Sequence, residues 1–100
     1  MEKSTPHYLL QEIQAIVAAR GLSAFTATAA FNAAGMGLSD GQAVAVVMTI
    51  SRAMFYKSMT THKDHRKWQD VYHAPCPNGK TAYIKFTLRD GAVVIQFKEK

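Results

Sequence analysis

The hydrophobic period of this chain changes once, close to Ile50, and this change constrains the fold more than any other feature. Before it, apolar residues recur at the three- and four-residue spacing of amphipathic helices. After it, aromatic and β-branched residues alternate with polar ones, as in half-buried strands. Helices followed by consecutive strands predict an α+β fold, in which N-terminal helices pack on one face of a C-terminal antiparallel sheet.

Three helices are expected in the first half. Thr5-Pro6 is typical of a helix start and Gly21 of a helix end, which predicts a first helix over residues 6–20. Its inward stripe should contain Leu9, Leu10, Ile13, Ile16 and Val17. An Ala-rich second helix is expected over residues 28–34, and Ser39-Asp40 should cap a third. The residues expected to face inward from the third helix are Val44, Val47 and Met48.

Four strands are expected in the second half, over residues 54–60, 68–74, 80–89 and 92–99. Asp90-Gly91 is typical of a two-residue type I′ turn, which fixes how the last two strands pair. The register collects one apolar face from Ile84, Phe86, Leu88, Val93, Ile95 and Phe97. A slip of one residue would mix the two faces. On the other face Tyr83 lies opposite Lys98, with Lys85 diagonally near.

Length and composition exclude several classes of protein. One hundred residues, 48% of them hydrophobic, suit one globular domain over residues 1–100. Cys76 is the only cysteine, which excludes an intrachain disulfide and favours a reducing compartment, the cytoplasm. No apolar run is long enough for a membrane helix, so no membrane partner is expected.

The net charge of +5 is concentrated in residues 51–100, which also contain seven of the ten aromatic residues. Phosphates require cations and unstacked bases require aromatic faces, so this composition favours a surface that binds nucleic acid. The structural alternative is a solvated basic face over an aromatic core.

Metal and thiol chemistry fit the sequence poorly. His62, Asp64 and His65 form a cluster to which His73 and Cys76 could add ligands, but no second cysteine completes a zinc set. Cys76 stands between two prolines and is expected to be an unreactive loop thiol. We therefore expect neither a metal site nor a cofactor.

The remaining polar residues suit RNA cleavage without a metal. Attack of a ribose 2′-OH on the adjacent phosphate needs a base, cations that stabilise the phosphorane, and an acid for the departing 5′ oxygen. Candidates for these roles are Lys57, Lys85, Lys98, Tyr83, His62 and His65. Each has a structural alternative, since strand lysines are often solvated and sheet tyrosines are often half-buried.

Six segments of the chain match a known family: Met1-Glu2-Lys3-x-Thr5-Pro6-His7, Phe55-Tyr56-Lys57-Ser58-Met59-Thr60-Thr61, Asp64-His65, Trp68-Gln69-Asp70-Val71-Tyr72, Tyr83-x-Lys85 and Phe97-Lys98-Glu99-Lys100. In these segments the chain resembles the MqsR family, the motility quorum-sensing regulator toxins. The resemblance implies a RelE-like microbial ribonuclease fold. It also implies a ribosome-independent mRNA interferase, the toxin of a type II toxin–antitoxin system. Metal-free cleavage at GC-containing sites would leave 2′,3′-cyclic phosphate and 5′-hydroxyl ends.

The catalytic residues that the resemblance carries over are Lys57, Gln69, Tyr83 and Lys98. We expect the two lysines to stabilise the phosphate, Tyr83 to donate a hydrogen bond or proton, and Gln69 to orient the 2′-OH or a base edge. The general base is either a lysine whose pKa is lowered by clustered charge, or His65. Further contacts to RNA are expected from Lys63, Arg66, Lys67 and Lys85.

Two partners follow from the resemblance, the mRNA substrate and an antitoxin resembling MqsA, which contains zinc and a DNA-binding part. The zinc would belong to that partner. Two other functions stay open from the sequence alone: a non-catalytic RNA-binding module, and a ribosome-dependent nuclease resembling RelE.

Overall fold

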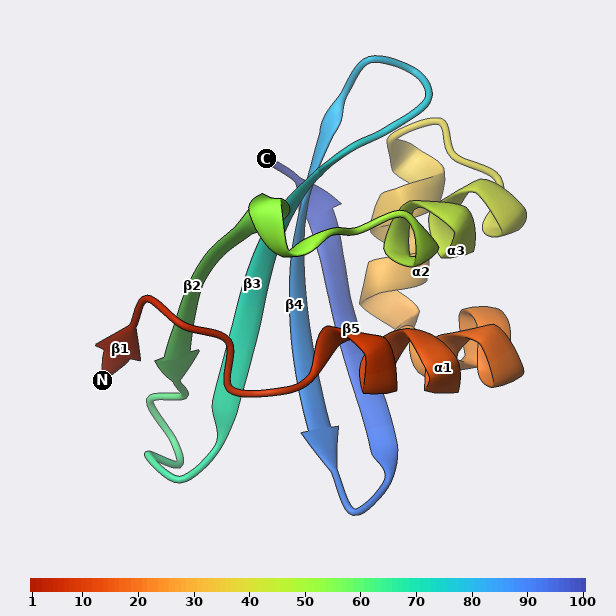
Figure 1. Cartoon of the computed structure of the whole chain (residues 1–100). Coiled ribbons are helices and arrows are strands. Elements are labelled where there is room, and N and C mark those ends of the chain that lie inside the picture. Colours follow the sequence, from red (N-terminus) through yellow and green to blue (C-terminus); the bar gives the residue numbers. More distant parts are fainter.

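The helices and the strands form separate layers, and residues 1–100 are all described by this computed structural model. The elements in chain order are β1 (Glu2–Lys3), α1 (Leu10–Arg20), η1 (Gly21–Ala24), α2 (Ala27–Gly35), α3 (Asp40–Met48), η2 (Arg52–Met54), β2 (Phe55–Thr60), β3 (Trp68–Pro75), β4 (Thr81–Arg89) and β5 (Ala92–Glu99). The five strands form one antiparallel sheet in sequence order (Figure 1). The predicted α+β fold is confirmed.

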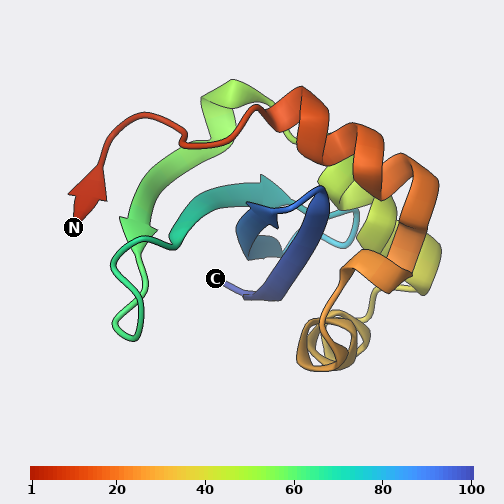
Figure 2. The same ribbon diagram turned by 90° about the horizontal axis from the view of Figure 1, so that it is seen from below.

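One face of the sheet is covered and the other is open. Figure 2 shows the curved sheet from one end, with α1 and α3 on one side and α2 beside β5. The core between the layers includes Tyr72, Ile84, Phe86 and Phe97 from the sheet and Val17 from α1, all almost completely buried. None of the helices has the length and apolar character needed to span a membrane.

The predicted hairpin of β4 and β5 is confirmed. Asp90 and Gly91 both have positive φ, at 53° and 75°, as a type I′ turn requires. Tyr83 pairs with Lys98 in the observed register. The predicted apolar face points into the core, and only Leu88 on it stays half-buried. The alternation of side chains and the turn together fix this register.

The prediction that the first helix begins at residue 6 is wrong, since α1 begins at Leu10. The backbone N–H groups of His7 and Tyr8 instead donate to the carboxylate of Asp70, at 2.9–3.0 Å. Asp70 is completely buried and also accepts the hydroxyl of Ser58 at 2.6 Å. The carboxylate thus holds residues 7–8 in a bend, and the helix begins only at Leu10.

Two predicted core residues are exposed. Leu9 is 73% exposed because it precedes α1, and Met48 is 39% exposed because it is the last residue of α3. From α3 the buried side chains are those of Ala43, Val46 and Val47. The predicted cap of this helix is correct, and Ser39 and Gln42 form a capping box.

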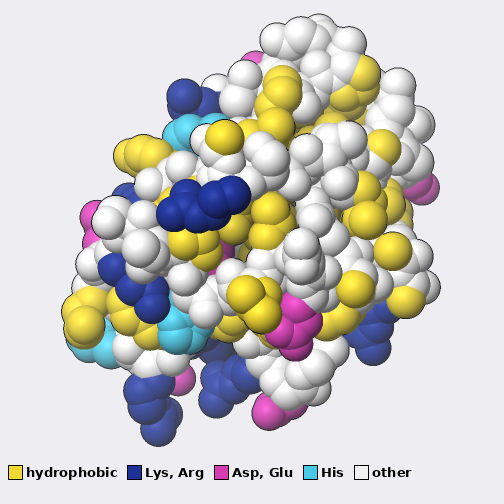
Figure 3. Space-filling model, viewed as in Figure 1, with side chains coloured by type: hydrophobic (Ala, Val, Ile, Leu, Met, Phe, Trp, Pro, Cys, Tyr) yellow, Lys and Arg dark blue, Asp and Glu magenta, His cyan; other side chains and the backbone are white.

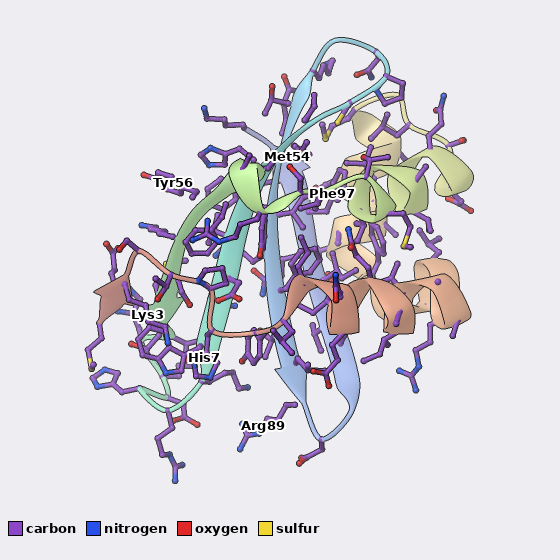
Figure 4. All side chains as sticks on the ribbon, viewed as in Figure 1. Lys3, His7, Met54, Tyr56, Arg89 and Phe97 are labelled. Carbon is purple, nitrogen blue, oxygen red and sulfur yellow. The ribbon has the colours of Figure 1, made fainter.

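Two edge contacts were absent from the predicted fold. The short strand β1 pairs with β2 and places Lys3 next to His7 (Figure 4), with 2.9 Å between Lys3 Nζ and His7 Nδ1. At the opposite edge, Phe25 forms a parallel bridge with Ile95 of β5. The backbone N–H of Thr26 donates to the Ile95 carbonyl at 3.1 Å, so the segment before α2 covers this edge.

Candidate active site

The candidate catalytic residues come from four strands and project from the open face of the sheet. Tyr83 of β4 pairs with Lys98 of β5, and Val71 of β3 pairs with both Lys57 and Lys85. Paired residues point to the same side of a sheet, as do residues two apart along a strand. The face defined in this way carries all four residues expected from the family resemblance, and Lys85: Lys57, Gln69, Tyr83, Lys85 and Lys98.

Lys85 occupies the centre of this positively charged group. Its side chain is half-buried, and burial together with the charges of Lys98 and Lys57 lowers its pKa below that of an ordinary lysine. The Lys98 Nζ lies 5.0 Å from the centre of the Tyr83 ring. One lysine is thus more readily deprotonated, while two neighbouring ammonium groups stay accessible.

Lys57 has a partner that sequence reasoning missed. Its Nζ lies 2.9 Å from a carboxylate oxygen of Glu2, on β1. This hydrogen bond and charge raise the pKa of Lys57 and lower that of Glu2. Lys57 therefore stays protonated at neutral pH. The two residues are 55 positions apart, and no sequence pattern predicts the two-residue strand that joins them.

A row of rings also crosses the open face. Tyr56 stacks on His73 with 4.4 Å between ring centres, and His73 lies 5.4 Å from Tyr83. His73 was considered only as a metal ligand, yet it pairs directly with Tyr83 across β3 and β4. Burial and the charge of Lys100 lower its pKa, which favours the neutral imidazole at pH 7. A predicted register for β3 and β4 would have indicated the contact of His73 with Tyr83, because paired residues point to the same side of the sheet.

Gln69 lies beside a shallow hollow of about 310 Å³ under the loop of residues 61–67. Lys63 and Lys67 line this hollow, as expected for contacts to RNA, and so does His62. The candidate base His65 is exposed and does not line it.

Arg66 is also exposed on this loop, where it forms a 3.2 Å ion pair with Asp64. The loop thus presents basic residues around one end of the open face. On the helix-covered side of the molecule, Figure 3 shows few Lys and Arg side chains over the helices, and most of those in view lie toward the strands and their loops.

A larger groove of about 420 Å³ lies between α2 and the last hairpin. Tyr83, Lys85 and Lys98 line its strand side. The side chains from the helix and its N-cap are Thr26, Thr28, Ala29 and Asn32. Because Tyr83, Lys85 and Lys98 also belong to the candidate catalytic group, a ligand bound in the groove would lie beside the Lys98 ammonium group.

Metal ligands do not converge in this structure: no group of three His, Cys, Asp or Glu side chains could hold an ion. The prediction that Cys76 is a loop thiol is only partly correct. Cys76 does follow β3, but it is buried, and burial raises the pKa of its thiol. A thiol with a raised pKa is a weak nucleophile at neutral pH.

Comparison with known proteins connects this face to a family. Residues 5–99 match the family described as "Motility quorum-sensing regulator, toxin of MqsA". The mRNA interferase toxin MqsR of Escherichia coli (strain K12) is 40% identical over 100 residues, which cover the whole of both chains. The chain belongs to the MqsR family. Its helices on one face of a five-stranded antiparallel sheet agree with the RelE-like fold expected for MqsR toxins.

Proposed function

We propose that this MqsR-family chain is a toxin with mRNA interferase activity, an endoribonuclease whose open sheet face binds and cleaves mRNA. The observation that carries the proposal is the group of Lys57, Tyr83, Lys85 and Lys98 on one accessible face. The name of the relative in E. coli, an mRNA interferase toxin, supports the same activity. No step of the proposed reaction needs a metal ion or cofactor.

Two lysines stabilise the phosphate in the proposed mechanism. The ion pair with Glu2 keeps Lys57 protonated and holds its ammonium group over the face. Lys98 supplies the second charge beside the Tyr83 ring. Preorganised cations stabilise the extra negative charge that develops on the phosphorane.

Proton transfer uses Lys85 and Tyr83. Lys85 has the lowered pKa that a lysine needs to accept the 2′-OH proton near neutral pH. The 2′ oxygen attacks phosphorus, the bond to the 5′ oxygen breaks, and Tyr83 donates the proton that this leaving oxygen takes up. The products are a 2′,3′-cyclic phosphate and a 5′-hydroxyl. His65, exposed on the 61–67 loop at one end of the open face, is the alternative base.

The remaining residues bind and orient RNA. Gln69 lies beside the 61–67 loop, where it can orient the 2′-OH or a base edge. Lys63, Arg66 and Lys67 contact phosphates along this end of the face. Cleavage at GC-containing sites, the absence of a ribosome requirement and action in the cytoplasm belong to the same proposal.

An antitoxin controls this activity in our proposal. The family description names the toxin of MqsA. A partner that resembles MqsA, with its zinc and its DNA-binding part, would therefore hold this chain inactive. The two chains would then bind each other as purified proteins, and the mixture would not cleave RNA.

The test is cleavage of a GC-containing RNA by the purified protein in EDTA, without ribosomes. We expect cyclic phosphate ends, and a loss of cleavage in Lys98→Ala with an unchanged circular dichroism spectrum. Lys80→Ala is the matched control, because Lys80 pairs with Glu99, whose partner across the sheet, Ala82, points to the covered face. Binding without cleavage would support a non-catalytic module. Cleavage only of translated mRNA would support a ribosome-dependent nuclease.

A further inference from the structure

We propose that the groove between α2 and β5 binds one nucleotide of the RNA, next to the cleaved phosphate, and that Gln96 and Asn32 recognise its base. The inference rests on the proposed function and extends it, because it assigns a specificity site to residues outside the catalytic group. Both amides line the groove, Gln96 from β5 and Asn32 from α2.

The groove has the size and lining of a nucleotide site. Its volume of about 420 Å³ lies within the range of small-molecule sites. The buried Ala29 and Phe97 form its floor, and the exposed Thr28 offers a methyl group to the flat face of a base. Lys85 and Lys98 stand at the strand side, where they can bind the phosphate attached to that nucleotide.

The wall formed by α2 is fixed in place before any ligand binds. The Asn32 Nδ2 donates to the Phe97 carbonyl of β5 at 3.0 Å, and the Thr26 backbone N–H donates to Ile95 at 3.1 Å. Thr26 also caps the helix by accepting the N–H of Ala29 at 3.0 Å. A preformed site loses less conformational entropy on binding than one that must be assembled.

The two amides can distinguish bases. With its Nδ2 directed to Phe97, Asn32 retains Oδ1 as an acceptor, and the exposed Gln96 amide offers both donors and an acceptor. Bases in single-stranded RNA are recognised by such contacts to their edges. Gln96 also lines the hollow beside Gln69, so one RNA strand can pass from the 61–67 loop to this groove.

The test is cleavage of an RNA pool randomised on both sides of a central dinucleotide, with sequencing of the cut ends. We expect Gln96→Leu to reduce the preference at one flanking position by roughly five- to 150-fold. Thr28→Phe should partly fill the groove and slow cleavage of the preferred sequences at least tenfold. The matched control is Ala27→Phe in the same turn, since Ala27 is exposed and does not line the groove.

An unchanged sequence profile for Gln96→Leu, with normal cleavage by the wild-type chain, would overturn the inference and leave the proposed function standing. A second measurement is independent of cleavage: titration of the wild-type chain with each nucleoside 3′-monophosphate, followed by NMR. Binding should shift the amide signals of Thr28, Asn32 and Gln96 for one nucleotide more than for the others. Equal or absent shifts at these residues would contradict the proposed site even if the chain does not cleave RNA.

Discussion

At the residue scale, the lowered pKa of Lys85 is the property on which its proposed role as a base depends. Lys85 is half-buried between strands and faces two further lysines, and together these effects lower its pKa. Replacing it with methionine should reduce cleavage by about 10²- to 10⁴-fold, the usual contribution of general acid–base catalysis. Stability should stay within about 1 kcal/mol of wild type or rise, since a partly desolvated charge is removed. Single-turnover cleavage and urea denaturation measure the two effects.

The pH dependence of cleavage follows from the same residue. In the proposed mechanism Lys85 is the base and must be neutral, so the rate should rise with pH and level off as the pH passes the lowered pKa of Lys85. Lys57→Met removes one of the charges that lower this pKa, so the remaining activity should require a higher pH. A profile that levels off at the same pH in both proteins would point to another base, such as His65.

Asp70 has a structural role that a mutation can isolate. In Asp70→Ala, two backbone N–H groups and the Ser58 hydroxyl lose their buried acceptor. We expect the free energy of unfolding to fall by about 3 kcal/mol, measured by urea denaturation. Asp64→Ala is the control, because the ion pair of Asp64 with the exposed Arg66 lies on a surface loop, and its loss should lower stability much less than the loss of Asp70.

At the scale of elements, the turn of the last hairpin depends on one glycine. Gly91 has φ of 75°, so Gly91→Ala should lower stability by about 1 kcal/mol through backbone strain, although no atom lies close to the added methyl group. Gly41→Ala in α3 also meets no atom but has an ordinary backbone, and should raise stability by about 0.5 kcal/mol. Thermal unfolding of both variants tests this opposite pair of effects.

The same hairpin explains which features could be predicted from sequence. The type I′ turn and the alternation of side chains are local, and they predicted correctly that Tyr83 and Lys98 face each other. The start of α1 depends on Asp70, more than 60 residues away, and was therefore placed too early. The contact of Glu2 with Lys57 and the packing of α2 beside β5 are equally long-range, so the groove could not be predicted.

At the scale of the whole molecule, ten of the twelve Lys and Arg residues lie in residues 51–100, in the strands β2–β5 and the segments next to them. For single-stranded RNA, the slope of log K against log salt changes by about 0.7 for each phosphate contact. Replacing Lys63, Arg66 and Lys67 with glutamine should thus reduce the magnitude of this slope by about 2. Arg20→Gln on α1 should leave it unchanged. Filter binding at several salt concentrations measures the slope, and equal slopes in all three proteins would exclude the loop from RNA binding.

The two faces of the sheet differ in role: the covered face forms the hydrophobic core, and the open face carries the candidate catalytic residues. Helices bury the apolar face of the hairpin, while Tyr83, Lys85 and Lys98 on its polar face line the groove in which we propose that RNA binds. In the proposed mechanism the nucleophile is the ribose 2′-OH of the substrate, so the substrate itself can be altered to test it.

The most direct measurement is cleavage of an RNA in which the nucleotide before the cut carries a single 2′-deoxy substitution. The mechanism predicts that cleavage at this position disappears, while other sites in the same RNA are still cut to cyclic phosphate ends. Undiminished cleavage at the deoxy position would contradict attack by the 2′-OH and the roles proposed for the open face.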